Sequence, residues 1–327
     1  MTATPLPLAA VVELPPETSG ALTFHLPLEV FALQAAGADP AVIESRIADR
    51  LADAYRDGLV DPPLYRWAVE HHRPIARDLL DPSPAVREAA FRSILPLGDG
   101  LAGAAFHGLI RLGYAAWRGE VEEVARGLAY LRTRRQVLAG GAGGAGAGSG
   151  AMPPPDERQG ATVFDLLNLA AGAGGRDDLT DPAAALPSPR AMAARAADLV
   201  RHDASSFVAI HAVTGLHGLV EVHRLVTGAA PGDDVAGTVL APWWRAYAAA
   251  LRACALVVEG TPRVGTPECT ETFTDVEVLV RAAIDSGDTH SVKLVVALRR
   301  LVELGLVDEP TLLELGAIKL AVDECDA

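Results

Sequence analysis

The sequence is poor in the residues that build disulfide-rich, zinc-binding and aromatic-rich proteins. Only three of its 327 residues are cysteines, and they form no CxxC pair. This argues against a disulfide scaffold and a zinc ribbon and suits a reducing compartment, so we expect a cytoplasmic protein. Aromatic residues make up only 5% of the chain. Their scarcity favours helices packed through small side chains over sheets.

Long apolar runs and an excess of positive charge are also missing. No run reaches the length of a membrane span, and the first twenty residues combine four prolines with no basic segment. We therefore expect neither a transmembrane helix nor a signal peptide. The formal net charge of -14 would repel phosphate groups, so we expect no nucleic acid and no membrane as a partner.

Alternation of period two is not convincing anywhere, whereas apolar residues recur at three- and four-residue steps along most of the chain. This predicts an all-α, multi-helical fold. The expected helices span residues 40–57, 64–80, 84–95, 101–117, 119–138, 189–202, 205–226, 242–259, 273–285, 289–304 and 309–323.

One segment interrupts the helical pattern. Residues 139–160 (AGGAGGAGAGSGAMPPPDERQG) are rich in Gly and Pro, which predicts a flexible, disordered surface loop. Their GAGGAG stretch matches GxGxxG, but no strand precedes it, so we reject a nucleotide site. Two domains flanking this loop would be an alternative. We favour a single domain over residues 1–327, because each half carries two of the four histidines considered next.

Four histidines lie inside apolar segments, namely His25, His107, His211 and His290. A single buried histidine most often hydrogen-bonds a backbone carbonyl. Four of them meeting in a helical core could instead bind iron, copper or zinc, which accept imidazole ligands. Other catalytic patterns are missing, since the chain has no GxSxG, HExxH or ExxH.

Lys293 follows His290 by three residues and is surrounded by apolar positions on almost every side of its helix. Burial would favour its neutral amine, which can add carbon dioxide to form a metal-binding carbamate. The alternative is a salt-bridged lysine at the edge of a helix.

The remaining histidines fit such a centre less well. His217 and His223 follow His211 at steps of six residues, so we expect at most one of the three, His211, to face a shared centre. His71 and His72 stand among charged residues, and we expect both to be solvated.

Five segments resemble the questin oxidase-like family, in the same order and with similar spacing. The most specific are those that contain FHGLIRLGYA and DTHSVKLVVAL. The segments are FHLPLEVFALQAAGADP (24–40), FHGLIRLGYAAW (106–117), AIHAVTG (209–215), WRAYAAALRACALV (244–257) and GDTHSVKLVVALRR (287–300).

The resemblance implies a helical oxygenase that acts on an aromatic polyketide, such as an anthraquinone. The expected reaction is ring opening or a Baeyer–Villiger-type oxygen insertion, with NADPH implicated in the family. Metal-dependent members are similar in using non-haem iron(II) held by four histidines and a lysine carbamate made with carbon dioxide. Carried over by position, the metal ligands would be His25, His107, His211, His290 and Lys293.

The chain departs from the family pattern at two segments. Phe24 replaces an asparagine, and Leu28 and Glu29 replace histidines, so Glu29 becomes a candidate partner for His25. Arg111 replaces a later histidine and changes the charge of the expected pocket. We expect Arg111 and Tyr114 to act as catalytic or substrate-contacting residues.

Two other functions stay open at this stage. The protein could be a non-catalytic, helical small-molecule-binding protein in which the histidines only satisfy buried hydrogen bonds. It could also be a metal-free, NADPH-dependent monooxygenase. The expected partners of the preferred function are dioxygen and an aromatic small molecule; the oligomeric state stays open.

Overall fold

The computed structural model describes residues 11, 13–19, 23–135, 185–261 and 272–326. The all-α prediction is confirmed, since the only sheet in these ranges pairs two antiparallel strands, β1 (Glu17–Thr18) and β2 (Leu59–Val60). The helices are α2 (Leu26–Ala35), α3 (Pro40–Asp57), α4 (Tyr65–Leu79), α5 (Pro84–Ile94), the 3₁₀ helix η1 (Leu95–Gly100), α6 (His107–Arg118), α7 (Val121–Thr133), α9 (Pro189–His202), α10 (Phe207–Thr227), α11 (Ala241–Glu259), α12 (Val276–Asp285), α13 (Thr289–Glu303) and α14 (Glu309–Asp326). The loop predicted over residues 139–160 lies outside the described residues.

Most helices begin where side chains or prolines favour a start. Asp39, Ser188 and Ser206 accept a hydrogen bond from a backbone N–H of the first turn, in α3, α9 and α10 respectively. Pro84 stands in the first turn of α5, where its missing N–H costs nothing. These local signals explain why the expected and observed bounds of these helices agree closely.

Helix α2 was missed by the periodicity analysis. Eight of its residues, Leu26–Leu33, are buried, so no polar face alternates with an apolar one. The expected helix over residues 101–117 was also wrong at its start, because α6 begins only at His107. The preceding residues Ala104, Ala105 and Phe106 all have positive φ, between 47° and 66°. Left-handed backbone is unfavourable for residues with a side chain, so the surrounding structure must hold this turn in place.

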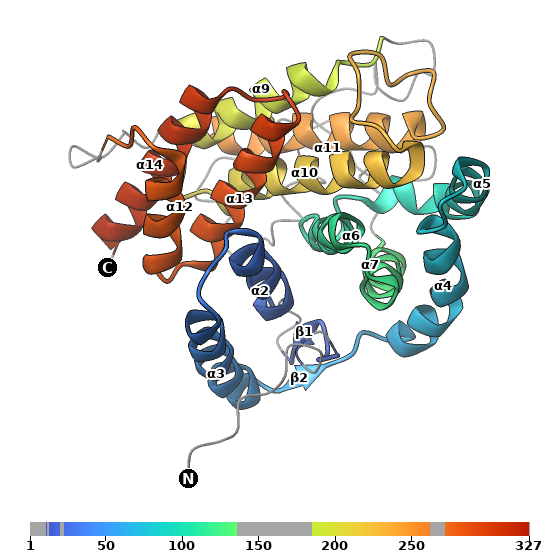
Figure 1. The fold of residues 1–327 in the computed structure, drawn as a ribbon, viewed down its shortest axis with the longest axis horizontal. Coiled ribbons are helices and arrows are strands. Elements are labelled where there is room, and N and C mark those ends of the chain that lie inside the picture. Colours follow the sequence, from blue (N-terminus) through green and yellow to red (C-terminus); the bar gives the residue numbers. More distant parts are fainter. Residues whose placement is uncertain (1–10, 12, 20–22, 136–184, 262–271, 327) are drawn as a thin grey trace.

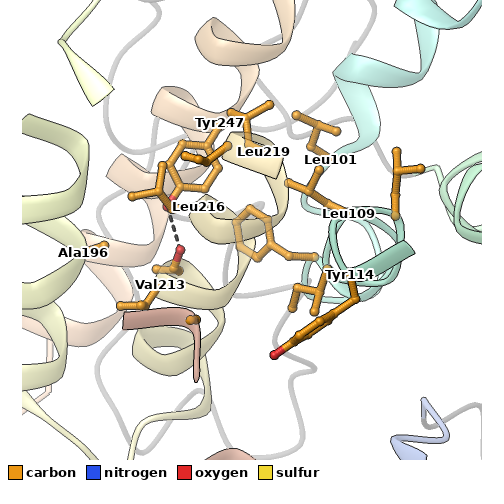
Figure 2. Packing of buried hydrophobic residues seen from close by; sticks show 14 of the residues in the cluster. Leu101, Leu109, Tyr114, Ala196, Val213, Leu216, Leu219 and Tyr247 are labelled. Atoms are coloured by element: carbon orange, nitrogen blue, oxygen red, sulfur yellow. Dashed lines mark hydrogen bonds between the residues drawn. The ribbon is translucent and has the colours of Figure 1, made fainter. Parts of the chain in front are cut away.

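One main hydrophobic core runs through the molecule and includes buried residues from Leu28 to Val322. Figure 1 shows the first helices, α2 and α3, beside α12 and α13 from the other end of the chain. In the centre, Tyr247 of α11 donates a 2.6 Å hydrogen bond to the Ala212 carbonyl of α10, next to Leu216 and Leu219 (Figure 2). None of the described helices is long and apolar enough to cross a membrane.

Four helices form a closed ring in which each contacts the next, in the order α2, α6, α10 and α13. Each of them carries one of the four histidines singled out in the sequence at or near its beginning. The tightest contact is between α6 and α10. A Cβ atom on Gly113 would lie 2.3 Å from the Gly218 Cα, and one on Gly218 would lie 2.7 Å from the Leu109 carbonyl oxygen. Glycine is therefore needed at both positions for the two backbones to approach this closely.

We expect Gly113→Ala to lower the free energy of unfolding by about 1–3 kcal/mol, because the added methyl group must push α6 away from α10. Gly232→Ala is the matched control, since nothing lies within 4 Å of a Cβ at that exposed glycine. Urea denaturation of both variants measures the difference. An equal stability of the two variants would contradict the close packing of α6 and α10.

Candidate metal centre

The four histidines singled out in the sequence all stand near the beginning of a helix in this ring. His25 is the N-cap residue of α2, and His107 is the first residue of α6. His211 lies on the second turn of α10, and His290 is the second residue of α13. The ring therefore presents one imidazole from each of its four helices.

The four imidazole rings lie close together, with centroid distances of 4.6 to 6.3 Å between the pairs in contact. The Nε2 atom of His107 lies 2.7 Å from the Nε2 atom of His25 and 3.1 Å from that of His211. One ring nitrogen from each of His25, His211 and His290 lies within 4.8 Å of the others. These distances agree with the expectation that the side chains share a centre. Their role as metal ligands stays a prediction.

Hydrogen bonds fix the orientation of two of these rings. Nδ1 of His107 faces the Ala104 carbonyl, and Nδ1 of His211 lies 2.7 Å from the Phe207 carbonyl. A carbonyl only accepts, so each Nδ1 carries the proton and each Nε2 of a neutral ring presents a lone pair. At 3.1 Å the lone pairs of the two Nε2 atoms therefore face and repel each other. A cation bound by both nitrogens would remove this repulsion.

The environment keeps these rings neutral. Burial, followed by the nearby Lys293 amine, lowers the pKa of His107 to about 3. Burial is also the main cause that holds the pKa of His25 and His211 well below the ordinary value, and it lowers the pKa of His290. Neutral imidazole is the form that binds a metal.

Lys293 completes the group. Its side chain is 1% exposed, and its Nζ atom has no hydrogen-bond partner among the described residues. Burial lowers its pKa to about 8, against the opposing effect of the Glu29 and Asp288 carboxylates. The alternative of a salt-bridged lysine at a helix edge is therefore wrong. A second unpartnered atom, Nε2 of His290, is buried at the same centre.

Three of these helices, α6, α10 and α13, contact one another in the same order from their N-terminal ends. His107 meets His211 where α6 and α10 begin, and Gly113 meets Gly218 about two turns later. Glu221 of α10 likewise pairs at 2.7 Å with Arg300 of α13, about ten residues beyond their histidines. The positive ends of the helix dipoles therefore converge on the centre, where they disfavour cationic side chains and favour an anion.

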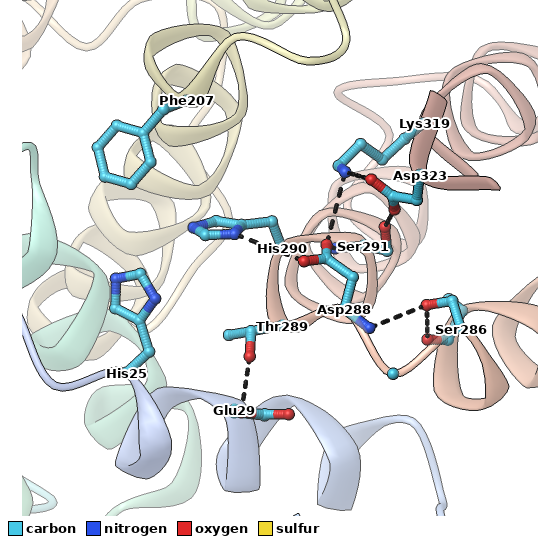
Figure 3. A network of polar contacts seen from close by, with 12 residues as sticks. His25, Glu29, Phe207, Ser286, Asp288, Thr289, His290, Ser291, Lys319 and Asp323 are labelled. Carbon is cyan, nitrogen blue, oxygen red and sulfur yellow. Dashed lines mark hydrogen bonds and ion pairs between the residues drawn. The ribbon is translucent and has the colours of Figure 1, made fainter. Parts of the chain in front are cut away.

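Glu29 has a different partner from the one expected. Its buried carboxylate accepts a 2.6 Å hydrogen bond from the Thr289 hydroxyl and pairs with Arg46 and Arg50 of α3. It thereby joins the helix that follows His25 to the turn that carries His290 (Figure 3). Glu29 thus acts between helices, rather than on the His25 ring.

Phe207 is a site residue that the sequence analysis missed. Its ring stacks on His211 at a centroid distance of 3.7 Å and lies 5.5 Å from the ring of His290. Figure 3 shows Phe207 facing the same space as His25 and His290. All three are only partly buried, whereas His107 and His211 are buried, so this side of the group is the less enclosed one. Phe207 precedes His211 by four residues, so the two side chains share one face of a helix. This spacing could have indicated Phe207 from the sequence.

The two residues expected to touch substrate contact other parts of the protein. Arg111 is buried and forms a two-point ion pair with Glu123 of α7, at 3.1 Å for each bond. The Tyr114 ring lies 5.2 Å from His217, and its hydroxyl has no hydrogen-bond partner in the described ranges. Catalytic roles for Arg111 and Tyr114 stay predictions.

The other histidines are distributed partly as expected. His211 joins the centre, whereas His217 packs against Tyr114 and His223 accepts a 3.3 Å hydrogen bond from Trp244. The expectation of a solvated His72 was wrong, since it is 2% exposed. His72 lies on the buried face of α4, together with Ala68, Val69 and Ala76, which precede or follow it by three or four residues.

Comparison with known proteins adds no identification. A scan against models of protein families finds no match to this chain, and a search of curated proteins finds none either.

His217 offers a test of the electrostatics in this ring. Burial lowers its pKa to about 3, whereas an unfolded histidine titrates near 6.5. Between these pH values the unfolded chain binds more protons, so the free energy of unfolding falls as the pH decreases from about 6.5 towards 3. We expect His217→Leu to flatten this dependence in urea denaturation series. His71→Leu, at an exposed position, should keep the slope of the unchanged protein.

Proposed function

We propose that this protein is a non-haem iron oxygenase that acts on an aromatic polyketide of the anthraquinone type. The observation that carries the proposal is the meeting of neutral imidazoles whose Nε2 lone pairs face one another beside an unpartnered buried amine. The iron ligands would be His25, His107, His211, His290 and Lys293. The substrate class and the reaction, ring opening or oxygen insertion, come from the sequence resemblance.

The residues present fit iron(II) better than they fit a structural core. An unpartnered buried polar atom costs about 1–3 kcal/mol, and the centre contains two, Nζ of Lys293 and Nε2 of His290. Facing lone pairs add further repulsion. The chemistry that iron(II) supplies at such a site is activation of dioxygen for attack on an electron-rich ring.

The charges around the centre favour a carbamate at Lys293. The nearest carboxylates are already paired, Glu29 with Arg46 and Arg50, and Asp288 with Lys319. A divalent ion held by neutral imidazoles at four helix N-termini would lack an anionic donor. The neutral Lys293 amine can attack carbon dioxide, and loss of the N–H proton to water leaves a carbamate anion that supplies this charge.

The protein side chains would also orient the substrate. Phe207 covers one side of the imidazole group and offers a flat surface for an aromatic ring. The partly exposed side formed by His25, Phe207 and His290 would admit the substrate. The buried side, around His107 and Lys293, would keep water from the reacting atoms.

The first test of this function is metal content and oxygen uptake. After expression with iron, we expect about one iron per chain and dioxygen consumption in the presence of a hydroxyanthraquinone, measured by metal analysis and an oxygen electrode. His107→Ala should lose both, because its Nε2 atom contacts the Nε2 atoms of His25 and His211. His71→Ala is the matched control at an exposed position. A metal-free wild-type protein after this treatment would favour the binding-protein alternative.

The second test concerns Lys293. We expect Lys293→Ala and Lys293→Arg to lose iron and turnover, because neither can form a carbamate and guanidinium keeps its charge. Lys293→Glu should recover part of the metal binding. Removal of bicarbonate should lower the iron content of wild type while leaving that of Lys293→Glu unchanged. Full activity of Lys293→Arg would rule out the carbamate.

A further inference from the structure

Lysine is almost absent from this protein. Only two of its 28 basic residues are lysines, Lys293 and Lys319, and all the others are arginines. Both lysines are buried, with 1% and 5% of their surface exposed. They lie on neighbouring helices, α13 and α14. Lys293 has no hydrogen-bond partner among the described residues, whereas Lys319 is surrounded by carboxylates, so the same side chain has two different environments.

Lys319 forms ion pairs with two acidic residues next to the first turn of α13, which carries His290. Its Nζ atom lies 3.5 Å from Oδ2 of Asp288 and also pairs with Asp323, one turn further along α14. Asp323 in turn accepts a hydrogen bond from the hydroxyl of Ser291 (Figure 3). Helix α14 therefore holds the first turn of α13 through two connected polar contacts.

Asp288 links this network to the centre. Its Oδ2 accepts a 2.6 Å hydrogen bond from the Ser291 N–H and caps α13, while its Oδ1 lies 3.8 Å from Nδ1 of His290. The Asp288 carboxylate therefore lies beside the ring nitrogen of His290 that points away from the centre, and Lys319 and the Ser291 N–H hold it there.

We propose that Lys319 is a positioning residue for His290, acting through Asp288. The ammonium holds the Asp288 carboxylate, and that carboxylate fixes the His290 ring so that its unpartnered Nε2 points to the centre. A carboxylate behind a ligating histidine also makes the ring a stronger donor. The inference rests on the proposed function, because it assigns Lys319 a role only if His290 binds a metal.

The choice of lysine at this position has a physical reason. A single ammonium is a compact point charge with three donors, so it can reach both Asp288 and Asp323 from a nearly closed space. The other side of the same turn is held separately, by the hydrogen bond from Thr289 to Glu29. Loss of Lys319 would therefore free the Asp288 carboxylate without detaching the whole turn from α2.

Cobalt(II) binding to the 327-residue protein tests the proposal, because the absorption bands of bound cobalt(II) report ligand geometry without turnover. We expect Lys319→Met to lower cobalt(II) affinity about 10–100-fold, as for other residues that orient a ligand, and to change the absorption spectrum. Lys319→Arg keeps the charge but not the compact ammonium, so it should recover only part of both. Arg195→Met removes an exposed ion pair with Glu259 and serves as the matched control.

Asp288→Asn provides a second variant should Lys319→Met fail to fold, since asparagine caps a helix as well as aspartate does. It should show the same loss of affinity and the same spectral change in a folded protein. Wild-type affinity and spectrum in a folded Lys319→Met or Asp288→Asn protein would overturn the inference and leave the metal centre standing. Failure of the wild type itself to bind cobalt(II) would overturn both proposals together.

Discussion

The backbone contact between α6 and α10 is the constraint on which the candidate centre depends. Two glycines, Gly113 and Gly218, remove the side chains that would otherwise separate these helices. The approach continues back to the beginnings of both helices, where His107 and His211 bring their Nε2 atoms to 3.1 Å. A wider spacing would still allow a helical core, but the two imidazoles could no longer share one ion.

The left-handed turn before α6 serves the same arrangement. Three successive residues with side chains, Ala104 to Phe106, have positive φ, and each such residue costs about 1–2 kcal/mol. In return, the turn starts α6 at His107 and directs the Ala104 carbonyl at Nδ1 of that histidine. Strain of this kind persists where the surrounding structure holds it in place, which is common at functional sites.

The two lysines of the chain are both buried, but only one of them has carboxylate partners. Lys293 is buried without a counter-charge, which favours the neutral amine. Lys319 is nearly as buried but forms ion pairs with two carboxylates, those of Asp288 and Asp323. Identical side chains on adjacent helices are thus suited to different tasks, one as a reactive amine and the other as a fixed cation.

Local sequence was sufficient for most of the helices. Proline and cap residues such as Asp39 and Ser188 mark starts that the structure reproduces, because these signals act within one turn. Helix α2 is buried on almost every side, so it has no amphipathic pattern from which to predict it. The start of α6 follows three residues with positive φ, a conformation that their own side chains do not favour.

By itself the sequence determined an all-helical fold and identified four histidines and a lysine in apolar segments, because periodicity and apolar flanks are local properties. Only the tertiary structure decided that these side chains meet, since His25 and His290 are 265 positions apart and neither segment specifies its distance from the other. It likewise decided that Arg111 pairs with Glu123 and that Phe207 covers the imidazoles. Such contacts depend on which helices pack together, and packing is set by the whole core rather than by any one segment.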